Sequence, residues 1–124
     1  MNFVTVAVIN DISDNSVIDK SSPNIWMDNT HNNVLSSGVA SYQPINGIMK
    51  TAQGGIVLSN NASYNVISNY QINNNAAYGV NILATCDYNI VSASMISGND
   101  GGNIINNGYG NEIHSVFNGT SFLT

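Results

Sequence analysis

Arginine is absent from this chain of 124 residues, and its only strongly basic residues are two lysines, Lys20 and Lys50. Seven acidic residues give a net charge of −5. A chain with so few cations cannot neutralise a run of phosphates, so neither nucleic acid nor an anionic membrane surface is an expected partner. No apolar run approaches the roughly 18 to 20 residues of a membrane span, and the sequence predicts no membrane segment.

Cysteine and charge are scarce as well. Cys86 is the only cysteine, which excludes an intramolecular disulfide and a cluster of cysteine metal ligands. Only 7% of the residues are charged, against about 25% in typical domains. The polar residues are uncharged instead, with 23 Asn and 15 Ser, while Val, Ile, Leu and Phe together number 33. This composition predicts one folded domain that is richer in strands and turns than in helices.

A repeat of about 22 to 24 residues, a period typical of stacked repeat folds, runs through most of the chain. The window 55–68 begins Gly-Ile-Val-Leu and ends Ser-Tyr-Asn-Val-Ile-Ser. The window 79–92 has the same spacing, beginning Gly-Val-Asn-Ile and ending Asp-Tyr-Asn-Ile-Val-Ser. A third copy starts at Gly101, and a fourth, around Trp26 and Asn33, precedes the first by a longer interval. The alternation of apolar residues within each copy is typical of strands, and no long stretch keeps the helical period.

The aligned copies predict an all-β fold in which short strands stack repeat upon repeat. A unit this short cannot bury its own apolar face, but copies stacked about 4.8 Å apart can share one core, as in a parallel β-helix. About five such rungs are expected. The predicted inward columns are Trp26, Leu58, Ile82 and Ile104, and Leu35, Ile67, Val91 and Ile113; the predicted structural ladder is Asn33, Asn65, Asn89 and Asn111.

The blocks Tyr-Asn-Val-Ile-Ser at 64–68 and Tyr-Asn-Ile-Val-Ser at 88–92 each follow a strand-opening glycine at the same offset. They resemble the right-handed parallel β-helix repeat of the pectate-lyase-like superfamily, which includes polysaccharide lyases, mannuronan epimerases and bacteriophage tailspikes. The resemblance implies a right-handed solenoid over residues 23–116, and it specifies no particular enzyme. Lyases of that superfamily commonly use calcium-holding acidic clusters with an Arg or Lys that acts on the substrate proton. The absence of Arg argues against that chemistry here.

The ends of the chain and one internal segment depart from the repeat. Residues 1–22 are expected to form an irregular N-terminal rung or cap, and residues 117–124 a C-terminal cap or oligomer contact. Extra residues near 42–53 predict an insertion that projects from the wall. Residues 1–10 and residues 115–124 contain none of the charges that usually protect exposed strand edges. The apolar residues Phe117, Phe122 and Leu123 therefore predict a homotrimer in which they are buried near the three-fold axis.

Two acidic residues are weak catalytic candidates. Asp87 and Asp100 are the only acidic pair close to each other within the regular repeats. Hydrolysis of a sugar bond needs two carboxylates about 5 to 10 Å apart, although solvated turn positions also explain both residues. His31 and His114 belong to different columns about three rungs apart, too far to share one metal ion. The sequence thus predicts no metal site and no cofactor.

Aromatic residues are the candidates for ligand binding. Tyr64 and Tyr88 occupy adjacent repeats beside the Asn column, where their rings are expected to stack. Together with Tyr42 in the insertion they are candidates for binding sugar rings, and cross-strand packing alone is the competing explanation of the pair.

These observations favour a structural, receptor-facing module of a phage tailspike or similar extracellular fibre that contacts cell-surface polysaccharide. Such a module would lie outside the cell or on a virion surface. Two alternatives stay open. One is a fragment or degenerate relative of a β-helical polysaccharide lyase, hydrolase or epimerase, and the other is an adhesin or surface-layer repeat that binds glycans without cleaving them. The lack of Arg and the few carboxylates favour a role without catalysis.

Overall fold

The computed structural model describes residues 3–6, 11–12, 23–41 and 54–123, and all the regular elements of these residues are strands. The chain is therefore all-β, as predicted, and the described part has no helix able to cross a membrane. The strands are β1 (Phe3–Val6), β2 (Asp11–Ile12), β3 (Ile25–Asp28), β4 (Val34–Ala40), β5 (Gly54–Ser59), β6 (Val66–Asn73), β7 (Tyr78–Ile82), β8 (Ile90–Ser92), β9 (Met95–Ser97), β10 (Gly102–Asn106), β11 (Glu112–His114), β12 (Val116–Phe117) and β13 (Phe122–Leu123).

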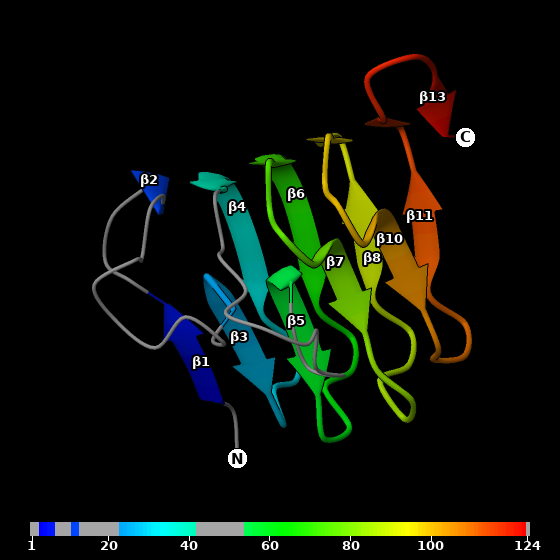
Figure 1. Ribbon diagram of the computed structural model, residues 1–124. Coiled ribbons are helices and arrows are strands. Elements are labelled where there is room, and N and C mark those ends of the chain that lie inside the picture. The colour runs from blue at the N-terminus through cyan, green and yellow to red at the C-terminus, as the bar shows by residue number, and fades with distance from the viewer. Residues whose placement is uncertain (1–2, 7–10, 13–22, 42–53, 124) are drawn as a thin grey trace.

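Strands from successive repeats lie side by side in two sheets (Figure 1). The first sheet has the order β1-β3-β5-β7-β10, and the second joins β2, β4, β6, β8, β9, β11, β12 and β13. In the first sheet β3, β5, β7 and β10 pair in parallel. In the second, β4, β6, β8 and β11 do the same. The sequence repeat is therefore also the unit of the sheets, and the four repeats are β3–β4, β5–β6, β7–β9 and β10–β12.

The second sheet bends at one residue in every repeat. The first residues of β6 pair with β8 and its last residues pair with β9. The bend divides the sheet into two halves. The first half contains β8 and β11, and the second half contains β2, β9, β12, β13 and the ends of β4 and β6. Left-handed backbone angles turn the chain out of the plane at this point. The bend residues Ser37, Asn69, Ala93 and Ser115 have φ values of 63°, 57°, 49° and 54°.

The core lies between the two sheets and is built from inward-facing aliphatic side chains. Leu35, Ile67, Val91 and Ile113 pair directly from strand to strand, so this predicted column is confirmed. Ile67 and Val91 are fully buried, whereas Leu35 and Ile113 are partly buried at the first and last repeats. Within this column, burial is complete only at the two middle repeats, which have a repeat on each side.

The other predicted apolar column is wrong at its N-terminal end. Leu58 pairs with Ile82 as predicted, but the residue of the first repeat that pairs with Leu58 is Met27. Trp26 pairs with Val57 instead. Because successive side chains of a strand point to opposite faces, this one-residue shift places Trp26 on the outer face. Its side chain is accordingly 39% exposed, while Met27 is fully buried.

The same column is wrong at its C-terminal end. Ile104 pairs with Val80, and Asn106 is the residue that pairs with Ile82. Ile104 still faces the core, because the shift is two residues, but it belongs to a different column and is only partly buried. Both errors arise because the turns that join the two sheets differ in length from repeat to repeat.

The terminal strands β1 and β13 lie at opposite ends of the stack of repeats. β1 pairs antiparallel with β3 and so covers one edge of the first sheet. β13 turns back antiparallel on β12 at the other end of the molecule (Figure 1). The insertion predicted near 42–53 and most of residues 1–22 lie outside the described residues, as do Tyr42, Lys20 and Lys50.

Candidate functional site

Four asparagines lie in one column at the turn that enters the second sheet. The Oδ1 atoms of Asn65, Asn89 and Asn111 accept hydrogen bonds from the backbone N–H of the ladder residue one repeat earlier, at 3.1, 2.9 and 2.7 Å. Each Nδ2 also donates to a backbone carbonyl, from Asn65 to Thr30, from Asn89 to Ala62 and from Asn111 to Cys86. These backbone groups lie in turns outside the named strands, and the side chains supply hydrogen bonds that buried backbone requires. The carbonyl of Thr30 also accepts from the backbone N–H of Ser63 at 2.9 Å.

A column of exposed tyrosines stands next to this ladder. Tyr64 and Tyr88 directly precede Asn65 and Asn89, and both have a φ of 58°. Their rings stack with centroids 5.3 Å apart and planes 13° apart. Tyr109 packs against Tyr88 with centroids 5.8 Å apart and an interplanar angle of 89°. We call Tyr64, Tyr88 and Tyr109 the tyrosine column.

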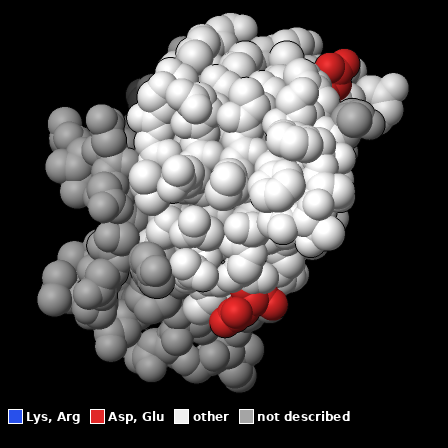
Figure 2. All heavy atoms as spheres, turned by 90° about the horizontal axis from the view of Figure 1, so that it is seen from above, with Lys and Arg blue, Asp and Glu red and all other residues white. Residues whose placement is uncertain are grey.

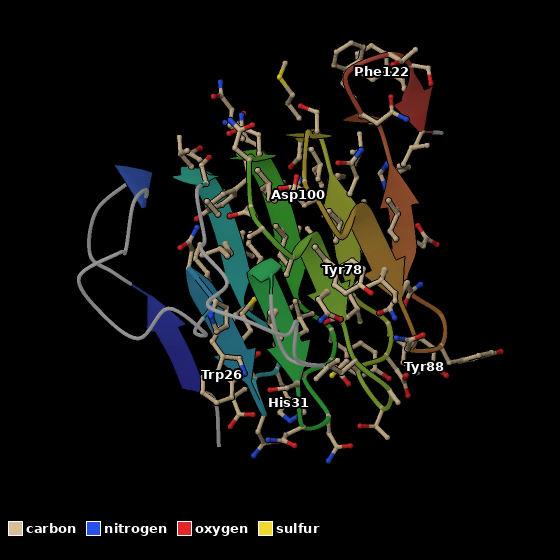
Figure 3. All side chains as sticks on the ribbon, in the orientation of Figure 1. Trp26, His31, Tyr78, Tyr88, Asp100 and Phe122 are labelled. Atoms are coloured by element: carbon tan, nitrogen blue, oxygen red, sulfur yellow. The ribbon has the colours of Figure 1, made fainter. Side chains whose placement is uncertain are left out.

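The tyrosine column is held firmly and is open to solvent. Left-handed backbone is unusual for a bulky residue, and the ladder hydrogen bonds on the following residue help to hold it. A Cβ at Gly110 would lie 2.6 Å from Cδ1 of Tyr88, so the glycine leaves room for the ring. The three side chains are 58%, 46% and 72% exposed. Figure 3 shows Tyr88 at a turn, beyond the ends of the strands.

The structure does not bring Asp87 and Asp100 together. Asp87 follows β7 and holds the turn: its Oδ1 accepts a hydrogen bond from the backbone N–H of Tyr109 at 2.8 Å. Asp100 precedes β10, and its backbone N–H donates to the carbonyl of Asn75 at 2.9 Å. Because β7 and β10 are parallel neighbours, and Asp87 follows β7 while Asp100 precedes β10, the two residues lie near opposite ends of these strands. Figure 3 labels Asp100. Each carboxylate belongs to a turn, and no shared acid pair is formed.

The two histidines are also separate. His31 forms an isolated bridge with Ser63 in the turn after β3, and His114 ends β11. Within residues 3–6, 11–12, 23–41 and 54–123, no group of three or more His, Cys, Asp or Glu side chains could hold a metal ion.

A second Asn ladder was missed at the turn that leaves the second sheet. The backbone N–H of Asn75 donates to Oδ1 of Asn99 at 3.1 Å. The side-chain amides of Asn75 and Asn99 donate to the carbonyls of Ala40 and Ile72, at 3.0 and 3.1 Å. The signal was present in the sequence, because the interval from Asn75 to Asn99 equals the interval from Asn65 to Asn89.

A grooved surface also lies on the second half of the second sheet. An apolar groove of about 670 Å³ is lined by Ala93, Met95, Phe117 and Phe122, among others. Met95 also borders a more polar groove of about 540 Å³. Of the predicted oligomer contacts, Phe117 is partly buried, Phe122 is 66% exposed and Leu123 is 37% exposed. Sequence reasoning missed Met95.

Comparisons with known proteins give no relative from which a function can be carried over. No protein-family model matches the chain, and no curated protein or solved structure matches it. The function therefore has to be argued from the side chains themselves.

The single cysteine offers a first test of the packing. Cys86 is fully buried, and burial raises the pKa of its thiol above the ordinary 9.0. Because the thiolate is the reactive form, we expect a thiol-exchange reagent at pH 8 to label the native protein far more slowly than the urea-unfolded chain. Equal labelling rates in the two states would show that Cys86 is not enclosed.

The raised pKa of Cys86 also affects stability. The thiol stabilises the fold below about pH 9 and loses this contribution above it.

Proposed function

We propose that the chain is a right-handed parallel β-helix module with a structural, receptor-facing role in an extracellular fibre such as a bacteriophage tailspike. The parallel register carried through both sheets supports this proposal, with the Asn ladder repeated at the same turn. In such a winding each repeat rests only on its neighbours, so the module forms a stiff rod with continuous walls. A fibre needs stiffness along its axis and side chains on its wall that meet a receptor.

The tyrosine column supports cell-surface polysaccharide as the receptor. A tyrosine ring offers an apolar face for the C–H groups of a sugar and a hydroxyl for its polar edge. Asp87 adds a carboxylate beside the column, although its Oδ1 already accepts a hydrogen bond from the backbone N–H of Tyr109. Because the rings are already packed against one another, binding would cost little side-chain ordering. The separation of Asp87 from Asp100 favours binding over cleavage by this pair.

The test is binding to an array of bacterial surface polysaccharides. We expect the wild-type chain to bind at least one polysaccharide, and the double variant Tyr64→Ala/Tyr109→Ala to bind it about tenfold or more weakly. An aromatic contact contributes roughly 0.5 to 1.5 kcal/mol, and about 1.4 kcal/mol is a factor of ten. Tyr78→Ala is the matched control, since Tyr78 lies in β7, away from the column (Figure 3).

Unchanged binding by the double variant would remove the tyrosine column from the receptor site. A wild-type chain that bound no polysaccharide would contradict the proposed receptor. The same samples report on cleavage, because new reducing ends would appear if the bound polysaccharide were hydrolysed. Such ends would favour the enzymatic alternative.

A further inference from the structure

The four residues that directly precede the Asn ladder form a row of their own. All four have left-handed backbone, with φ values of 59°, 58°, 58° and 67° in chain order. In the first three, the backbone N–H donates to the carbonyl of the residue just before the next member of the row, at 3.4, 3.3 and 3.0 Å. The turns of successive repeats therefore superpose, and the side chains of the row leave them alongside one another. We call this row, which consists of Asn32, Tyr64, Tyr88 and Gly110, the pre-ladder row.

Only the two middle members of the pre-ladder row carry rings. Tyr64 and Tyr88 stack with their planes 13° apart, so each ring covers one face of the other. Tyr88 is also flanked on its far side, because Tyr109 packs against it and a Cβ at Gly110 would lie 2.6 Å from its Cδ1. The far side of Tyr64 is turned toward the first repeat, where the row has Asn32, an exposed residue without a ring. Tyr64 therefore keeps one ring face open.

Asn32 leaves room for a ring beside Tyr64 and offers polar groups next to it. Neighbouring members of the row are one strand spacing apart, about 4.8 Å, which is a distance at which two rings pack well. Among the residues that the structure describes, the side-chain amide of Asn32 has no hydrogen-bond partner. An amide both donates and accepts hydrogen bonds, as sugar hydroxyl groups do. A sugar ring that stacks on Tyr64 would therefore meet this amide at its edge.

The charges of the chain disfavour an acidic sugar at this place. Asp87 directly precedes Tyr88, and the net charge is −5. The described residues include neither Lys nor Arg, since Lys20 and Lys50 both lie outside them. Figure 2 accordingly shows carboxylates and no basic side chain on the described part of the face that it views. A carboxylate or phosphate group on the sugar would be repelled and would meet no described cation.

We propose that Tyr64 binds an uncharged sugar unit on the ring face that it turns toward Asn32. The sugar occupies the place in the pre-ladder row that a ring at position 32 would fill, and the Asn32 amide meets its hydroxyl groups. Tyr88 and Tyr109 support Tyr64 from the other side and do not contact the sugar. This inference rests on the proposed function, because it names the ring face and the class of sugar at the same receptor site.

The variant Asn32→Tyr tests the proposal by filling that place. The φ of 59° at Asn32 matches the 58° of Tyr64 and Tyr88, so the new ring should stack on Tyr64 without lowering the melting temperature. We expect the variant to bind the polysaccharide that the wild type binds about tenfold or more weakly, since it covers the open face. Asn32→Ala is the matched control. It removes the amide but leaves the ring face open, so its binding should stay within about threefold of the wild type.

The opposite result has a clear meaning. If the sugar lay across the ring edges, Asn32→Tyr would lengthen the stack, and binding as tight as that of the wild type or tighter would overturn the proposal. Two single variants give a second test that does not depend on the folding of Asn32→Tyr. Tyr64→Ala should weaken binding about tenfold and Tyr109→Ala less than about threefold, because only Tyr64 contacts the sugar. Equal losses would overturn the proposal as well.

The array of polysaccharides separates this inference from the proposed function. We expect the polysaccharides whose binding Tyr64→Ala weakens to lack carboxylate and phosphate groups. Binding that depends on Tyr64 but is confined to acidic polysaccharides would overturn the class of sugar. Binding that Tyr64→Ala/Tyr109→Ala loses and Asn32→Tyr keeps would overturn the ring-face inference and leave the proposed function standing. A wild-type chain that bound no polysaccharide would overturn both.

Discussion

Replacing Asn89 by Ala should destabilise the fold by about 3 kcal/mol, because each buried group left without a partner costs roughly 1 to 3 kcal/mol. Oδ1 of Asn89 accepts hydrogen bonds from both the backbone N–H and the Nδ2 of Asn65, at 2.9 and 3.1 Å. Its Nδ2 donates to the carbonyl of Ala62 and to Oδ1 of Asn111, each at 3.0 Å. Asn89 is fully buried, so water cannot replace these bonds. Denaturant unfolding of the variant measures the loss.

Asn33→Ala is the matched control for this prediction. Asn33 starts the ladder and is only partly buried, and its Nδ2 donates to the carbonyl of His31 at 3.1 Å. The same Nδ2 also donates to Oδ1 of Asn65 at 3.2 Å, but this oxygen keeps the backbone N–H of Asn33 as a donor in the variant, so the expected loss is below about 1 kcal/mol. Equal losses for the two variants would mean that the column does not work as a buried ladder.

The second large effect is expected at Ile82, whose truncation to Ala should cost about 2 to 5 kcal/mol. Ile82 is fully buried, and its strand partner Leu58 is fully buried too. Neighbouring repeats pack on both sides, so the structure cannot readily collapse into the cavity that the variant creates. The free energy of unfolding from guanidinium titration gives the loss directly.

Ile104→Ala serves as the comparison, since Ile104 also faces the core but lies in the last described repeat and is partly buried. Its truncation should cost clearly less than that of Ile82. A loss below about half a kcal/mol at Ile82 would place this side chain outside the core and would refute the strand register.

Columns of like residues could be predicted wherever the repeat keeps its spacing. Asn65 and Asn89 are separated by the same interval along the chain as Ile67 and Val91, which pair in the sheet. A repeated side chain at a fixed offset indicates stacking, because each strand sees its own copy one spacing away. The stacked pair of Tyr64 and Tyr88 could be predicted on the same grounds.

The strand register within the first sheet could not be predicted by matching like residues at a fixed interval. Met27 pairs with Leu58, and Leu35 pairs with Ile67, but the first interval along the chain is one residue shorter than the second. The extra residue is in the turn between the two sheets, where the second repeat has Asn60 and Asn61, both with positive φ.

The turn between the two sheets also changes length in the last repeat, where it becomes shorter. Val80 pairs with Ile104, and Val91 pairs with Ile113, but here the second interval is two residues shorter than the first. The turn after β10 is therefore two residues shorter than the turn after β7. An alignment that matches Asn89 with Asn111 therefore pairs the residues of β7 and β10 two positions out of register. The apolar pattern does not reveal this error, because a turn can lose residues without changing the pattern.

The candidate surfaces differ in how far the sequence reveals them. Phe117 and Phe122 are conspicuous as apolar residues in an uncharged segment, so an exposed contact could be predicted there. Met95 could not be predicted as part of this exposed contact. The face of the sheet on which Met95 lies depends on the bend at Ala93, and alanine does not indicate a left-handed backbone. Local tertiary packing sets that angle, and only the structure reveals it.

Scalar couplings across hydrogen bonds, detected by NMR, show whether successive repeats stack in parallel register. The backbone N–H of Asn65 donates to Oδ1 of Asn89, and that of Asn89 donates to Oδ1 of Asn111. Stacked repeats predict correlations from the amide nitrogen of Asn65 to Cγ of Asn89, and from that of Asn89 to Cγ of Asn111. Couplings from these amides to carbonyls within their own repeat, with none reaching the next, would contradict the stacked arrangement.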